Sequence, residues 1–145
     1  GTFEAADWNY TLKKPVNAPE KPLMLELATS QEGYAKGVDA TTGLPAENYG
    51  NYGVIYKVNF TVAGKKPISF ILNPIGGPFA GYGVLENKTK GERQLLALPE
   101  KKVCLGSKIE EAIELAQLKA GEYSFIWSPP GASNLPVQLI WEKAE

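Results

Sequence analysis

The sequence predicts an all-β fold, a single antiparallel β-sandwich with Greek-key connections that spans residues 1–145. Eleven prolines and fifteen glycines divide the chain into short segments, which favours short strands over long helices. The clearest strand, Val54–Val62, alternates apolar residues on one face with Lys57, Asn59 and Thr61 on the other, the period-two pattern of a half-buried strand. A chain of this length buries roughly two thirds of its unfolded surface, which is enough for one core.

Eight further segments lie between turn residues and have the β-branched and aromatic content of strands. They are Asp7–Leu12, Leu23–Ala28, Ile68–Leu72, Tyr82–Glu86, Gln94–Leu98, Lys102–Leu105, Glu122–Trp127 and Val137–Glu142. The tetrapeptide AGKK predicts a hairpin turn between the 54–62 and 68–72 strands. Residues 1–20 are expected to form a less regular N-terminal extension. Residues 31–53 are poor in large aliphatic side chains and predict a long loop.

One segment, SKIEEAIELAQLK at residues 107–119, has helical features. Ser107 followed by Glu110 has the spacing of a capping box at a helix N-terminus. The apolar residues that follow recur at helical spacing, so a short helix near 108–117 is one interpretation. The same apolar residues also alternate tolerably well as a strand.

The residues that follow this segment favour a strand. Gly121 and, two positions later, Tyr123 match the tyrosine corner of Greek-key proteins, in which the tyrosine hydroxyl binds backbone a few residues upstream. Such a corner joins two strands, which favours a strand at 111–116. The local pattern fits both structures, so the helix is kept as the alternative.

The composition excludes several classes of function. The net charge is −1 and the lysines are dispersed, so no nucleic-acid surface is expected. No apolar run approaches the ~20 residues of a membrane-spanning helix, so no membrane insertion is expected. The chain has no histidine, the commonest general base and metal ligand, so we expect no enzyme, no cofactor and no zinc or copper site, while calcium on oxygen ligands stays open. The single cysteine, Cys104, cannot form an internal disulfide and is expected to be a packing residue.

Three other motifs are better explained by structure than by chemistry. The glycine-rich stretch at residues 73–83 contains prolines and precedes a strand, which favours a kinked β connection over a phosphate loop. Asp39 in VDATTG is a single carboxylate, fewer than a calcium loop needs, so a polar turn is expected. Glu110, Glu111 and Glu114 are expected to form a solvated face.

Exposed aromatic side chains are the remaining candidates for a ligand-binding site. Tyr34, Tyr49 and Tyr52 of the long loop, together with Asn134, are the predicted ligand-binding residues, because aromatic faces beside amides bind sugars or peptides. A second set of residues is predicted to shape turns and strand ends. These structural residues are Gly121, Tyr123, Pro129, Pro130, Gly131 and Pro136.

Three stretches between residues 48 and 142 carry a resemblance to a known family. They are NYGVIYKVNFTV, LNPIGGPFAG and LKAGEYSFIWSPPGASNLPVQLIW. They resemble an extracellular β domain of bacterial surface proteins that accompanies copper amine oxidase-like N-terminal domains. Asn51–Tyr56, Leu72–Gly81 and Pro129–Val137 match its pattern. The resemblance implies secretion, cell-envelope attachment and a binding or structural role, and it supplies no catalytic residues and no copper chemistry.

The expected function is therefore a secreted, non-enzymatic cell-surface module. It would bind envelope material, either wall polysaccharide or another surface protein, or act as a structural domain. The start at Gly1 without a methionine is interpreted as a mature domain whose leader has been removed. Two alternatives are a carbohydrate-binding module that uses the loop tyrosines and a secreted protease inhibitor that inserts the proline-rich loop after Trp127.

Overall fold

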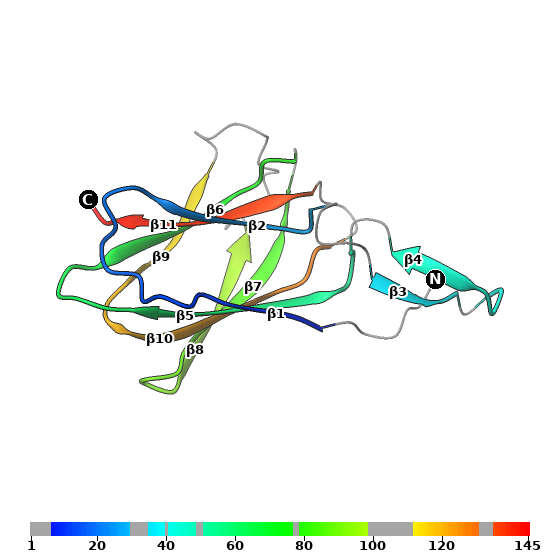
Figure 1. The fold of residues 1–145 in the computed structure, drawn as a ribbon, viewed down its shortest axis with the longest axis horizontal. Helices are drawn as coiled ribbons and strands as arrows, with labels where there is room; N and C mark the ends of the chain where they lie inside the picture. The colour runs from blue at the N-terminus through cyan, green and yellow to red at the C-terminus, as the bar shows by residue number, and fades with distance from the viewer. Residues whose placement is uncertain are drawn as a thin grey trace.

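The protein is an all-β sandwich, as the sequence predicts. The computed structural model describes residues 7–29, 35–39, 41–48, 51–76, 79–98, 112–130 and 135–145. A five-stranded sheet has the order β1-β5-β10-β7-β8, and a four-stranded sheet has the order β2-β11-β6-β9. Figure 1 shows these two layers, with the separate β3–β4 hairpin beyond one end of the sandwich. None of the described ranges holds a helix that could cross a membrane.

The strand bounds follow the sequence predictions closely. The strands are β1 (Asp7–Thr11), β2 (Leu23–Leu27), β3 (Ala35–Val38), β4 (Pro45–Asn48), β5 (Ile55–Val62), β6 (Ile68–Asn73), β7 (Gly81–Asn87), β8 (Glu92–Leu98), β9 (Ile113–Leu118), β10 (Gly121–Trp127) and β11 (Val137–Lys143). The β3–β4 hairpin lies within residues 31–53, where we expected a loop. The strand expected at residues 102–105 lies outside the described residues.

Pairing is antiparallel with one exception at the edge of the five-stranded sheet. Strand β1 runs parallel to β5, with Asp7 opposite Ile55 and Thr11 opposite Asn59. Val16 continues this edge through a parallel bridge to Val62, and its side chain is buried. The described part of the N-terminal segment therefore contributes the strand predicted at Asp7–Leu12 and one core residue.

The core lies between the two sheets and is rich in aromatic rings. Alternate residues of β5 point inward, so its burial follows the period of two seen in the sequence. Phe60 of β5 meets Phe70 of β6 and Trp141 of β11, with ring centroids 5.3 Å apart in both pairs. Phe70 also contacts Phe125 of β10 at 5.4 Å. Each such pair contributes about 1 kcal/mol beyond the burial of its area, and together they join the two layers.

Two local predictions are wrong. The AGKK segment is not a hairpin turn, because β5 and β6 belong to different sheets and the chain crosses between them there. The alternative of a short helix near 108–117 fails over its described part, because Ile113–Leu118 is strand β9, paired with β6. That pairing satisfies the backbone of β9 and overrides its helical propensity. Residues 108–111 lie outside the described ranges.

The crossover from β9 to β10 has the geometry expected of a tyrosine corner. The Tyr123 hydroxyl donates a hydrogen bond to the carbonyl oxygen of Lys119 at 2.8 Å. Its ring stacks on Phe60 with centroids 5.6 Å apart. Gly121 opens β10 directly before it, and a Cβ there would lie 3.3 Å from the Thr89 hydroxyl. The corner thus fixes how the chain passes from one sheet to the other.

Candidate functional site: the outer face of the five-stranded sheet

The residues predicted to bind ligand are not brought together by the described structure. Tyr34, Tyr49 and Asn134 lie outside the described residues. Tyr52 is 37% exposed, and its carbonyl oxygen accepts a hydrogen bond from the Asn48 side-chain amide at 2.7 Å. Tyr52 alone does not define a binding surface.

The stretches that carry the family resemblance meet at one end of the sandwich. The backbone amide of Gly53 donates to the carbonyl of Pro129 at 3.1 Å, and that of Gly76 donates to the carbonyl of Pro136 at 3.0 Å. A Cβ on Gly76 would lie 2.3 Å from the Leu135 carbonyl group, so only glycine allows this approach. The Leu135–Pro136 peptide bond is cis, and β11 begins directly after it.

Side-chain packing joins the same stretches. Asn51 is fully buried with φ of 53°, and its amide donates to the Tyr56 hydroxyl at 3.2 Å. A Cβ on Gly81 would lie 3.2 Å from Pro130. Pro129 is buried, and Gly131 lies outside the described residues. These contacts support a structural role for the motifs. Their described side chains and backbone amides connect the segments that meet at this end of the sandwich.

The polar turn expected at Asp39 is formed. The Asp39 carboxylate accepts hydrogen bonds from the amides of Thr41 at 2.7 Å and Thr42 at 3.2 Å, and these bonds lower its pKa. Glu114, the one described member of the predicted acidic face, accepts a hydrogen bond from the Ser69 hydroxyl. Within the described ranges, no three residues of the His, Cys, Asp or Glu types gather as metal ligands.

The outward face of β5, β10, β7 and β8 is divided into a polar half and an apolar half. Strand register places Asn59, Ser124, Glu86 and Arg93 in one row across the four strands. The next row towards the Pro129 end reads Lys57, Ile126, Val84 and Leu95 in the same strand order. Cross-strand neighbours on one face touch, so each row is a continuous strip.

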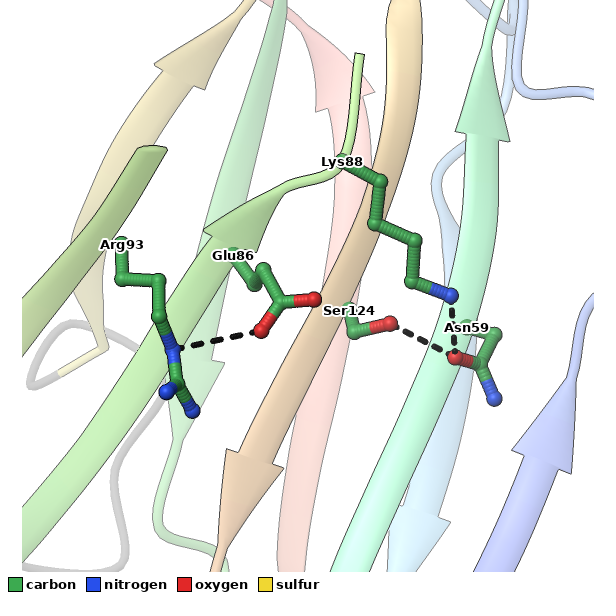
Figure 2. Close-up of polar contacts among 5 residues, drawn as sticks. All are labelled: Asn59, Glu86, Lys88, Arg93 and Ser124. Carbon is green, nitrogen blue, oxygen red and sulfur yellow. Dashed lines mark hydrogen bonds and ion pairs between the residues drawn. The ribbon is translucent and has the colours of Figure 1, made fainter. Parts of the chain in front are cut away.

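The side chains of the polar half form hydrogen bonds and an ion pair with one another, as Figure 2 shows. The Asn59 side-chain oxygen Oδ1 accepts from the Ser124 hydroxyl at 2.6 Å and from the Lys88 ammonium at 3.1 Å. Beside it, Arg93 pairs with Glu86 at 3.2 Å. Ser124 points outward from the sheet and yet is fully buried beneath its neighbours.

The apolar half is open. Ile55 is 41% exposed, Tyr82 66% and Leu95 69%. With Ile126 and Val84 these side chains line a shallow hollow of about 250 Å³. Its centre is low because the register, continued by one residue, places the small Ser128 side chain between Ile55 and Tyr82. We call these five residues the apolar patch: Ile55, Tyr82, Val84, Leu95 and Ile126.

Sequence reasoning missed the apolar patch, although one signal was available. The inward residues of β5 are the even-numbered ones from Val54 to Val62, which leaves Ile55 on the same face as Lys57 and Asn59. An apolar residue on the polar face of a half-buried strand indicates a surface contact or a second layer. In β8 no such signal exists, because Leu95 and Leu96 are adjacent and either could face the core.

The chain was compared with protein-family models, with curated proteins and with solved structures, and none of them matches it.

Proposed function

We propose that this protein is a non-enzymatic binding module of the bacterial cell envelope and that the apolar patch is its binding surface. The observation that carries the proposal is the exposure of Ile55, Tyr82 and Leu95 around one hollow on the same sheet face. The resemblance of the three sequence stretches to an extracellular surface domain supports the location. Secretion and envelope attachment are part of the proposal.

Energetics favour covering this patch. Burying apolar surface contributes roughly 25 cal/mol per Å², so covering a side chain as exposed as Leu95 or Tyr82 would contribute about 1–2 kcal/mol each. A contiguous patch of this kind on a soluble protein marks an interaction site more often than a chance exposure. The polar half is a weaker candidate for this contact, because Asn59 and Ser124 are bonded to each other and Glu86 is paired with Arg93.

Retention of the purified protein on isolated bacterial cell envelopes tests this function. The wild-type protein should be depleted from solution, and Leu95→Asp should be retained several-fold less, because a charge at one side of the patch opposes its burial. Met24→Asp is the matched control, because Met24 is 59% exposed on β2 of the other sheet. Equal retention of both variants and wild type would contradict the assignment of the surface.

A further inference from the structure

We infer that the ligand of the apolar patch is a protein segment that inserts one large apolar side chain into the hollow and places carboxylates beside it. This inference rests on the proposed function and names the ligand class of the same surface. It is carried by the shape of the hollow, by the chemistry of its walls and by the cations at its margin.

The hollow is a shallow socket, open over much of its area, and it is small enough for a single large side chain to cover. Ile55 and Tyr82 form opposite walls, Leu95 closes one side, and the half-buried Ile126 and Val84 form the floor. Its volume of about 250 Å³ is below the range of roughly 300–1,000 Å³ that small-molecule sites occupy. A leucine, isoleucine or phenylalanine anchor with its backbone outside fits such a socket. Interfaces between proteins commonly depend on a few anchors of this kind.

The walls favour protein over polysaccharide. Sugars bind by stacking on flat aromatic faces with hydrogen bonds to polar neighbours. Of the two aromatic residues that line the hollow, Tyr82 is exposed and Trp127 is buried, and the other large side chains are aliphatic. The polar side chains next to it, Asn59 and Ser124, are bonded to each other. An apolar centre with a tyrosine and a polar rim is instead the composition of a protein interface.

The charged residues at the margin of the patch indicate which residues should flank the apolar anchor of the ligand. Lys57 lies opposite Ile126 in the register, and Arg93 lies two residues from Leu95 on the same face of β8. The Arg93 side chain is 64% exposed, and its Nε atom contacts the Glu86 carboxylate. Two cations on two sides of the hollow favour carboxylates on both sides of an incoming apolar residue. Asp7, opposite Ile55, is the acidic group at the far end of the patch.

The patch is too small for a stable dimer of this chain. Its exposed side chains present on the order of a few hundred Å² of apolar surface. A stable interface needs about 800 Å² on each partner. A short segment with one anchor matches the available area better than a second sandwich does.

Selection from a phage-displayed random peptide library on the immobilised 145-residue chain tests the inference. Peptides with one large apolar residue and an Asp or Glu within about two positions on either side should be enriched. The affinity of the best synthetic peptide, measured by fluorescence anisotropy, should fall about tenfold with Leu95→Asp and stay unchanged with Met24→Asp. Lys57→Glu should weaken the acidic peptide and strengthen its Asp-to-Lys counterpart.

Two results would overturn the inference. One is a set of selected peptides that bind Leu95→Asp as tightly as wild type. The other is envelope retention that depends on Leu95 and survives protease treatment of the envelopes, which would assign the patch to a polysaccharide and leave the proposed function standing. Protease-sensitive retention that depends on Leu95 supports the protein ligand. Retention that does not depend on Leu95 removes both proposals.

Discussion

The two halves of the outer face of the five-stranded sheet are built from the same four strands and differ in how their side chains are satisfied. In the polar half, Asn59 and Ser124 bond to each other, Lys88 bonds to the same Asn59 oxygen, and Ser124 is fully buried. In the apolar half, Leu95 and Tyr82 remain more than half exposed. Polar side chains can satisfy one another's hydrogen bonds along a strip, whereas apolar side chains need a second surface to remove them from water.

The difference separates a structural role from a binding role on one face. Removing a member of the polar half should lower stability, because it leaves buried partners without hydrogen bonds. Removing a member of the apolar patch should leave stability unchanged and affect binding. Five variants and one control test the difference between structural and exposed side chains, beginning with the largest expected effect.

Asn59→Ala should destabilise the protein by about 2 kcal/mol, because the Ser124 hydroxyl would lose its acceptor while fully buried. The Lys88 ammonium and the Tyr10 carbonyl would lose a partner as well. Urea denaturation followed by tryptophan fluorescence measures the free energy of unfolding. Asn9→Ala, at an exposed position of β1 on the same sheet, is the control and should change it little. Equal effects would contradict a closed polar half.

Tyr123 and Tyr82 should show a similar difference between a structural and an exposed side chain, with a smaller loss of stability. Tyr123→Phe removes the hydrogen bond to Lys119 and should cost about 1 kcal/mol, whereas Tyr82→Phe should cost nothing measurable because Tyr82 is largely exposed. Thermal unfolding of the two variants and wild type in parallel measures the difference. A similar loss in both would contradict the structural role of Tyr123.

Alkaline pH gives a second measurement on Tyr123. Burial, and then the neighbouring Glu92 carboxylate, raise the pKa of Tyr123 above its ordinary value of 10.0. The unfolded chain therefore loses this proton first as the pH rises, and stability falls above about pH 10. Wild type should lose more stability than Tyr123→Phe between about pH 9 and pH 11. The same slope in both proteins would show that Tyr123 does not contribute.

Arg93→Gln tests the boundary between the halves. The Arg93–Glu86 pair is on the surface, so its loss should cost about 0.5 kcal/mol or less. The difference from wild type should shrink further in about 1 M salt, because the charges are screened. Chemical denaturation at low and high salt checks this, and a cost that salt does not change would indicate a packing role for the arginine stem.

Leu95→Asp should have the smallest effect on folding, within about 0.5 kcal/mol of wild type, because the side chain is 69% exposed. It should also raise the solubility limit by removing exposed apolar surface. The free energy of unfolding and the light scattering of concentrated solutions measure both. A loss of more than about 1 kcal/mol would mean that Leu95 supports the fold and would weaken its use as a binding probe.

Local patterns predicted the strands well and their partners less well. The period of two fixed the inward residues of β5, because side chains alternate in any extended strand. The AGKK segment marked a change of direction but did not reveal that β6 joins the other sheet. At Ile113–Leu118 the pattern suited both helix and strand, and pairing with β6 selected the strand.

The candidate site was less predictable than the fold. The loop tyrosines were chosen for their aromatic rings and their position in a long loop, which are properties of the sequence alone. The apolar patch depends on Ile55, Tyr82 and Leu95 being brought to one face from β5, β7 and β8, with β10 lying between β5 and β7 in the folded sheet. No spacing along the chain relates these three residues.

By itself, the sequence determined the all-β class, the positions of most described strands and the two faces of β5. Each of these follows from local geometry, in which short segments between glycine and proline alternate their side chains. Only the tertiary structure decided which sheet each strand joins and which apolar side chains are left uncovered. The physical reason is that burial depends on whether another layer packs over a face, and a strand's own residues do not specify that layer.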